Sequence, residues 1–216
     1  MWPVLLDLGA VRVTVFGLSL VLAFVLGSFM FWRRLRGDYD GEQLLTMWLW
    51  LVVASWAGSG IWACLPAGRC GGSWQLFGAM GLPLAVLIWW SRRHKWDGWE
   101  LVDAWGAVSL AVAVLAAAGW GPVSWQVALT SAIGLVIASL VRRWYRRWRW
   151  YTSGRMGVAG TIAIAWWGII ILVVANFAAW AVYSLECTVV LAAVIIYLRS
   201  GRQINRDIAL IWPNKK

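Results

Sequence analysis

The sequence predicts an all-α, polytopic membrane protein of about seven transmembrane helices. Hydrophobic residues make up 62% of its 216 residues and charged residues only 13%, and the mean hydropathy is +0.72. This composition is typical of a chain whose solvent is mostly lipid. Its apolar stretches are long rather than short and alternating, which favours helices, because every backbone N–H and C=O in hydrocarbon has to be paired internally.

Seven apolar stretches approach the roughly 17–25 residues that a helix needs to cross the bilayer. In chain order they are Val13–Trp32, Leu44–Leu65, Trp74–Trp90, Leu101–Trp120, Ser124–Val141, Gly157–Ala175 and Ala179–Leu198. The last two are separate helices only if a tight turn forms within Asn176–Ser184. Without that turn, the chain has six helices.

Basic residues follow the first, third, fifth and seventh stretches. They occupy Arg33–Arg36, Arg92–Lys95, Arg142–Arg155 and Arg199–Lys216, which together hold all but two of the 19 Lys and Arg residues, Arg12 and Arg69. Lys and Arg accumulate in cytoplasmic loops. The pattern therefore predicts that the N-terminus lies outside and the C-terminus lies in the cytoplasm.

The whole chain, 1–216, is predicted to be a single transmembrane domain. Residues 1–12 form an outer-surface segment, residues 13–198 hold the helices, and residues 199–216 form a cytoplasmic tail. The net charge of +10 is explained by a basic cytoplasmic rim, which attracts anionic headgroups by about 1 kcal/mol per residue near the surface. No nucleic-acid partner is predicted. The 21 Trp residues indicate aromatic belts at the membrane interfaces.

Three cysteines are present, and two of them share the loop after the second stretch. Cys64 and Cys70 are separated by Leu-Pro-Ala-Gly-Arg, and this outer loop would allow a disulfide in an oxidising compartment. The spacing permits a bridge without demanding one, so three free thiols remain an alternative. Cys187 lies near the outer end of the last stretch.

Ionisable residues are scarce within the predicted spans. Glu42, Glu100 and Asp103 stand at the cytoplasmic starts of their helices, and the only histidine, His94, lies in a basic loop. This scarcity argues against a proton relay, an ion-coupled transporter and a membrane metal site, each of which would need buried carboxylates or histidines. No metal and no cofactor are predicted. Glu186, near the outer face, either reaches the interface or faces a polar outer cavity.

The N-terminal residues Met1–Leu20, with Pro3, Gly9 and the pair Phe16–Gly17, resemble the opening of prolipoprotein diacylglyceryl transferase. Further segments resemble landmarks of that family in the same order. They are Asp40–Leu45, Ala57–Ile61, Gly71–Gly81, Ser91–Lys95 and Leu101–Gly106, followed more loosely by Tyr151–Gly157 and Tyr197–Arg202. The resemblance is closest over residues 1–110.

This resemblance implies a multi-pass protein of a bacterial-type plasma membrane, with seven helices and its N-terminus outside. The family moves a diacylglyceryl group from phosphatidylglycerol to the lipobox cysteine of a prolipoprotein. The resemblance thus implies two partners, a membrane lipid such as phosphatidylglycerol and the prolipoprotein signal peptide. By family position, the lipid-binding residues would be Phe16, Gly17, Gly58, Gly60, Phe77 and Gly78.

The chain departs from the family where the family's chemistry resides. Phe16 stands in place of a Tyr, Gly60 in place of an Arg and Phe77 in place of a His. The apolar run Leu110–Trp120 replaces the family's Gly-Arg-x-Gly-Asn signature, and Gly168–Phe177 lacks the expected Arg and Glu. Transfer to a thiol needs a proton acceptor and cations that stabilise the departing phosphate. No catalytic residue is therefore predicted at these positions.

Two functions remain open on sequence grounds. In the first, the chain is a divergent transferase that uses other groups near the outer face, namely Arg12, Arg69 and Glu186. In the second, the chain keeps the fold and a lipid-sized cavity but serves as a non-catalytic lipid-binding or interaction protein. The sequence leaves its oligomeric state open.

Overall fold

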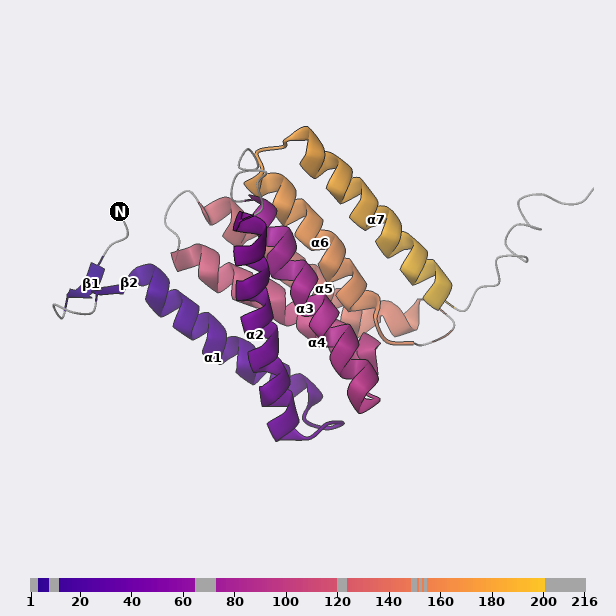
Figure 1. Cartoon of the computed structure of the whole chain (residues 1–216). Helices are drawn as coiled ribbons and strands as arrows, with labels where there is room; N and C mark the ends of the chain where they lie inside the picture. Colours follow the sequence, from indigo (N-terminus) through magenta and orange to yellow (C-terminus); the bar gives the residue numbers. More distant parts are fainter. Residues whose placement is uncertain are drawn as a thin grey trace, which may run out of the picture.

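A computed structural model of the chain describes residues 4–7, 12–64, 73–119, 124–148, 151, 153 and 155–200. Within these residues the chain forms seven α-helices, preceded by a short β-hairpin (Figure 1). Strand β1 (Val4–Asp7) pairs antiparallel with β2 (Arg12–Thr14). The predicted all-α class is confirmed for the bundle, and the hairpin at its N-terminal edge was not predicted.

The helices begin and end within a few residues of the predicted stretches. They are α1 (Val15–Leu35), α2 (Gly41–Cys64), α3 (Ser73–His94), α4 (Gly98–Gly119), α5 (Trp125–Trp144), α6 (Val158–Val174) and α7 (Ala179–Arg199). A single 3₁₀ turn, η2 (Tyr145–Arg147), follows α5. The start of α1 is fixed by the Thr14 hydroxyl, which accepts a hydrogen bond of 3.1 Å from the Gly17 N–H.

Successive helices alternate in direction (Figure 1). Helices α1, α3, α5 and α7 therefore end where α2, α4 and α6 begin, and we call this end of the bundle the basic end. At the other end, α6 and α7 are joined by a tight turn in which Asn176 and Phe177 have positive φ angles of 50° and 58°. The Phe177 N–H donates to the Leu172 carbonyl at 3.0 Å. This turn separates α6 from α7, so the six-helix alternative is wrong.

Helix α4 is the central helix and packs against α1, α5 and α6. Asp103 of α4 is buried, and its carboxylate accepts hydrogen bonds from the Gly157 N–H at 2.8 Å and the Gly160 N–H at 2.5 Å. These N–H groups belong to the first turn of α6, which has no helical partners for them. A Cβ on Gly160 would lie 2.5 Å from the Val102 carbonyl oxygen. The glycine thus allows α4 and α6 to approach closely enough for Asp103 to cap α6.

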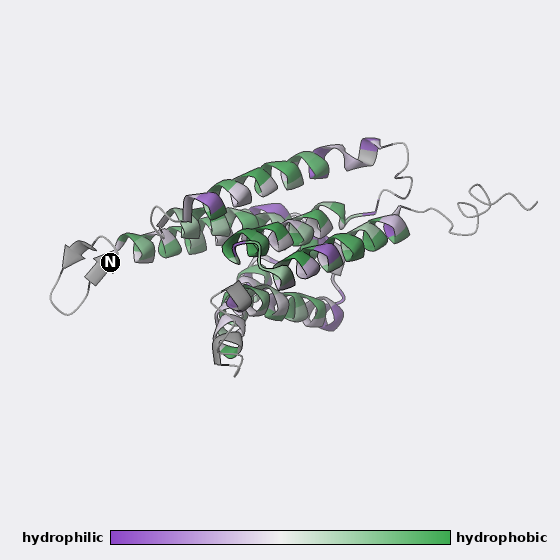
Figure 2. Cartoon of the chain, turned by 90° about the horizontal axis from the view of Figure 1, so that it is seen from above, coloured by the Kyte–Doolittle hydropathy of each residue, from purple (hydrophilic) through white to green (hydrophobic). Residues whose placement is uncertain are grey.

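The exterior of the bundle is apolar. Hydrophobic residues line the helices along their lengths, while hydrophilic residues lie mainly near the helix ends (Figure 2). Among the described residues, five helices are long and apolar enough to cross a membrane, namely α1, α2, α4, α5 and α7. Their exposed faces carry large aliphatic side chains such as Val21 on α1 and Leu191 on α7. The chain is a multi-pass membrane protein.

Part of the loop that follows α2 lies outside the described residues. This part includes Arg69 and Cys70, and the side chain of Cys64 is not described either. The disulfide between Cys64 and Cys70 therefore stays a prediction. Cys187 is a free, exposed cysteine on α7.

Candidate functional site

The candidate site is an apolar cavity of about 570 Å³ within the first half of the bundle. It exists because α1 packs mainly against α4, whereas α2 packs mainly against α3, which leaves space where α1 passes α2. The lining residues are Phe16, Leu20, Ala23 and Phe24 of α1, Trp48, Leu51, Val52, Ser55, Trp56 and Ser59 of α2, Ala79 and Met80 of α3, Trp105, Ser109, Val112, Ala113 and Ala116 of α4, and Trp167 of α6. The volume is within the range of ~300–1,000 Å³ found for small-molecule sites.

The cavity wall carries no charged side chain among the described residues that line it. Its polar side-chain atoms are the hydroxyls of Ser55, Ser59 and Ser109 and the indole N–H groups of its tryptophans. The Ser109 hydroxyl donates to the Gly106 carbonyl at 2.9 Å and accepts from the Trp167 Nε1–H at 3.0 Å. With its proton held by a carbonyl and no base among the lining residues, Ser109 is not activated as a nucleophile.

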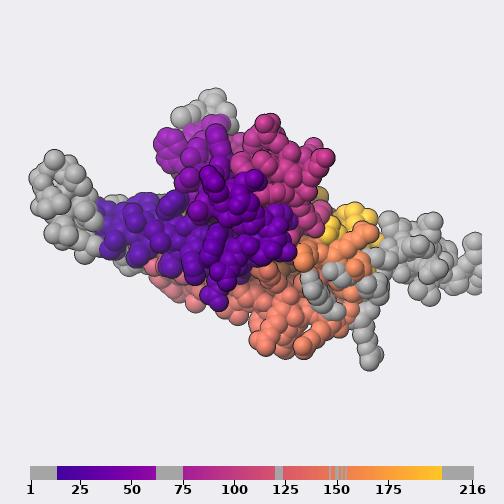
Figure 3. All heavy atoms as spheres, turned by 90° about the horizontal axis from the view of Figure 1, so that it is seen from below, coloured from indigo at the N-terminus to yellow at the C-terminus, as the bar shows by residue number. Residues whose placement is uncertain are grey.

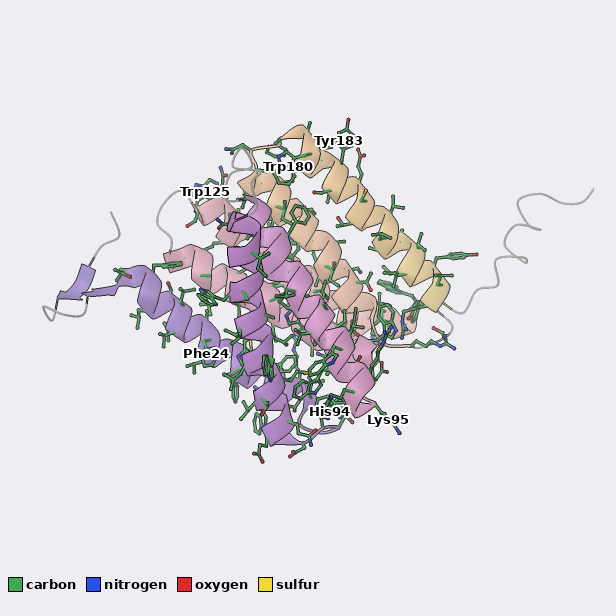
Figure 4. All side chains as sticks on the ribbon, viewed as in Figure 1. Phe24, His94, Lys95, Trp125, Trp180 and Tyr183 are labelled. Atoms are coloured by element: carbon green, nitrogen blue, oxygen red, sulfur yellow. The ribbon has the colours of Figure 1, made fainter. Side chains whose placement is uncertain are left out.

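The cavity opens sideways, toward the apolar exterior. Four of its lining residues are exposed, namely Leu20 and Phe24 of α1 and Val52 and Trp56 of α2. Trp56 is the most exposed of them, at 81%. Figure 4 labels Phe24 on α1, beside α2. An acyl chain could therefore enter from the hydrocarbon layer without passing through a polar region.

One lining tryptophan has an unused hydrogen-bond donor. The Trp48 side chain is only 5% exposed, and its Nε1 atom is buried without a hydrogen-bond partner. Its ring packs against Phe31, with 5.5 Å between ring centroids, and fills the space beside Gly27. A buried N–H without an acceptor is costly. The Nε1 atom does not face the open space of the cavity, so Trp48 lines the cavity with its ring carbons.

The residues predicted by family position do not converge on this cavity. Phe16 lines it, while Gly17 lies beside the Thr14 hydroxyl that caps α1. Phe77 of α3 contacts Trp180 of α7, with ring centroids 6.0 Å apart. Thus one of the two aromatic replacements lies at the cavity, and the other faces α7.

The predicted glycines have different surroundings. Gly58 and Gly78 are buried together where α2 crosses α3, and a Cβ on Gly58 would overlap the Gly78 carbonyl. Gly60 is exposed, and a Cβ there would meet nothing within 4 Å. Gly60 therefore stands at an open position, whereas Gly58 is required by the packing of two helices.

The three polar residues that were predicted to lie near the outer face are only partly described. Glu186 is exposed on α7. Arg12 belongs to β2, but its side chain lies outside the described part of the chain, as does all of Arg69. A cluster of these three groups stays a prediction.

Sequence reasoning missed the residues on α2 that line the cavity. Trp48, Val52, Ser55 and Ser59 follow one another at intervals of four, three and four residues, which places them on one helix face. That spacing, with small hydroxyl residues in an apolar helix, was the available signal. The sequence could not show which neighbouring helix this face meets.

Among the described residues, no group of three or more His, Cys, Asp or Glu side chains is placed to hold a metal ion. Comparison with known proteins finds no family model that matches the chain and no similar curated protein.

Proposed function

We propose that this protein binds a membrane lipid in the cavity between α1 and α2, through an acyl chain, and does not transfer the lipid to another molecule. The observation that carries the proposal is a cavity of about 570 Å³ with an apolar, uncharged wall and exposed lining residues on two neighbouring helices. The lipid that the family resemblance implies is phosphatidylglycerol. Binding without transfer is favoured because the described wall supplies neither a proton acceptor nor a cation.

The proposal includes a topology of seven spans, with the N-terminus outside and the C-terminus in the cytoplasm of a bacterial-type cell. The basic residues support this orientation, because those in the described helices gather at the basic end. Aromatic residues lie at both ends of the bundle. Trp125, Trp180 and Tyr183 lie at one end, far from His94 and Lys95 (Figure 4), and Trp90 and Trp96 contact His94 at the basic end. Such residues are enriched at membrane interfaces.

Affinity for the lipid has to come from packing and hydrogen bonds rather than from the hydrophobic effect. A lipid tail is already in an apolar medium, so its transfer into the cavity removes no apolar surface from water. The Trp48 Nε1–H is a buried donor without a partner, and the Ser55 hydroxyl also lines the cavity. The Ser55 hydroxyl can donate to an ester carbonyl of a diacyl lipid, which would distinguish the bound lipid from bulk lipid, whereas the Trp48 Nε1–H is too deeply buried to reach it.

The experiment is a comparison of bound lipid in two matched variants. Ala113 of α4 lines the cavity, so Ala113→Phe should fill part of it; Val190 of α7 is exposed and does not line it, so Val190→Phe is the control. After purification in mild detergent, native mass spectrometry should show a retained diacyl lipid on the unaltered protein and on the control, and much less on Ala113→Phe. Equal retention by all three proteins would reject the cavity as the lipid site.

A further inference from the structure

A second pocket, separate from the lipid cavity, lies at the basic end. It has a volume of about 320 Å³ and shares no lining residue with the apolar cavity. Its described lining residues are Glu100 and Asp103 of α4, Arg142 and Arg143 of α5, Tyr145 of η2, and Met156 before α6. Figure 3 shows this end of the molecule, where the orange region of α5 and α6 lies beside the indigo region of α1 and α2.

Positive charge at this pocket is incompletely balanced. Arg34 of α1 lies close enough to Arg142 for the two guanidinium groups to repel each other, and Asp103 attracts Arg34. The Arg34 Nη1 atom is buried without a hydrogen-bond partner. Burial of an ionised group that lacks partners is unfavourable, because water no longer solvates it. Arg34 does not line the pocket, but its charge adds to that of Arg142, which does, and an anion beside Arg142 would offset the repulsion between the two guanidinium groups.

Asp103 balances the positive charge of Arg34 and Arg142 only in part. Both of its carboxylate oxygens accept hydrogen bonds from the first turn of α6, through the N–H groups of Gly157 and Gly160. It is also attracted by Arg142 and by Arg199. Arg199 stacks on the Trp99 ring at 4.3 Å and is not among the residues that line the pocket. The single negative charge of Asp103 is therefore shared among the α6 N-terminus, Arg34, Arg142 and Arg199.

Glu100, the second carboxylate that lines the pocket, favours anions that also carry a hydrogen-bond donor. Glu100 accepts a hydrogen bond of 2.9 Å from the Tyr39 hydroxyl. Burial, together with the bond to Glu100, raises the pKa of Tyr39 above its ordinary value, so this hydroxyl remains a donor. The remaining acceptor capacity of Glu100 suits a hydroxyl or an ammonium group. A ligand that fits this pocket carries an anionic group that binds the arginines and a hydrogen-bond donor that binds Glu100.

We propose that this pocket binds a phosphate group that bears a hydroxyl or a primary ammonium substituent, with the phosphate on Arg142 and Arg143 and the substituent on Glu100. Arginine is suited to this because its planar fork matches phosphate oxygens. The phosphate can belong to the headgroup of a phospholipid, since the pocket lies at the ends of α4 and α5, or to a soluble phosphate ester. This site is independent of the lipid cavity and of the function proposed for it.

The test uses the full-length protein in nanodiscs of phosphatidylcholine, whose headgroup carries no donor. In one arm, phosphatidylglycerol is added to the nanodiscs; in the other, glycerol 3-phosphate is titrated in solution. Arg142→Gln is the pocket variant, and Arg92→Gln is its control, because both arginines are exposed and lie near the ends of their helices at the basic end. We expect Arg142→Gln to weaken binding roughly tenfold or more, as loss of a charged hydrogen-bond partner does, and Arg92→Gln to leave it unchanged.

The two arms separate the sources of the phosphate. Binding of phosphatidylglycerol alone assigns a lipid headgroup, and binding of glycerol 3-phosphate with the same dependence on Arg142 assigns a soluble ester. Equal weakening by both variants would show a general effect of surface charge and would overturn the proposal, as would no weakening by Arg142→Gln. Arg143→Gln repeats the test at a second exposed lining residue, in case Arg142→Gln unfolds. Ala113→Phe should leave phosphate binding unchanged, so an experiment that contradicts one of the two proposed sites does not contradict the other.

Discussion

Asp103 has a different role from the one that its position in the sequence indicates. At the start of an apolar helix, a carboxylate is expected to face the membrane surface. The structure buries Asp103 to 5% exposure and sets it against the N-terminus of α6. A helix N-terminus presents free N–H groups and partial positive charge, both of which stabilise a carboxylate. One ionisable residue thereby fixes the contact between two helices that are far apart in the sequence.

The first prediction concerns this cap. Asp103→Ala would leave the N–H groups of Gly157 and Gly160 buried without acceptors, which should lower the free energy of unfolding by about 2–4 kcal/mol. Chemical unfolding in detergent, followed by circular dichroism, measures the change. Asp38→Ala is the control because Asp38 is exposed in the turn between α1 and α2, and we expect less than about 0.5 kcal/mol there. Similar losses in both variants would mean that the two hydrogen bonds contribute little.

At the scale of the helices, the sequence predicts where each helix lies but not which helices pack together. Apolar runs and the arginines that follow them are local signals, and they place α1 and α7 within a few residues of their observed bounds. The apolar cavity depends on the pairing of α1 with α4 and α2 with α3. That pairing is decided by contacts between distant segments, so the lining of the cavity could not be predicted from local patterns.

Gly58 and Gly60, within one turn of α2, show that the sequence does not reveal which face of a helix packs against its neighbour. Both belong to the same small-residue segment, but only Gly58 faces α3. We predict that Gly58→Ala lowers the free energy of unfolding by about 1–3 kcal/mol, because the added methyl group overlaps the Gly78 carbonyl. Gly60→Ala should be neutral or stabilising by up to about 1 kcal/mol, since alanine favours helices. Thermal unfolding of the two variants in the same detergent gives the comparison. A larger loss of stability for Gly60→Ala than for Gly58→Ala would mean that α2 is rotated about its axis, with Gly60 rather than Gly58 facing α3.

For the whole molecule, the orientation in the membrane can be tested with single cysteines in a variant that lacks Cys64, Cys70 and Cys187. Phe177 is exposed in the turn between α6 and α7, and Lys95 is exposed at the basic end. A membrane-impermeant maleimide should label Phe177→Cys in spheroplasts and Lys95→Cys only after permeabilisation. Asp38→Cys, which also lies at the basic end, should likewise be labelled only after permeabilisation. The reverse pattern would invert the proposed topology.

The same bundle could in principle hold either a transferase or a lipid-binding protein, because a fold does not determine its chemistry. The distinction lies in the charged groups that the cavity presents to a lipid. Its described wall has three serine hydroxyls but neither an imidazole nor a guanidinium group. The arginines of the second pocket lie at the basic end, and none of them lines the lipid cavity. The arrangement of the whole molecule therefore separates the apolar cavity from the cations that diacylglyceryl transfer would require to stabilise the departing phosphate.

We predict that the purified protein, in lipid that contains phosphatidylglycerol, transfers no diacylglyceryl group to a lipobox peptide at a rate above background. Loss of one preorganised electrostatic group typically costs about 10²–10³ in rate, and several are absent from the described cavity wall. Phe77→His alone should restore nothing, because Phe77 packs toward Trp180 of α7 and is not among the lining residues. Mass spectrometry of the peptide measures transfer, with an authentic transferase as the positive control. Robust turnover that is lost in Glu186→Gln would instead establish a divergent transferase that works from its outer face, and the non-catalytic proposal would be abandoned.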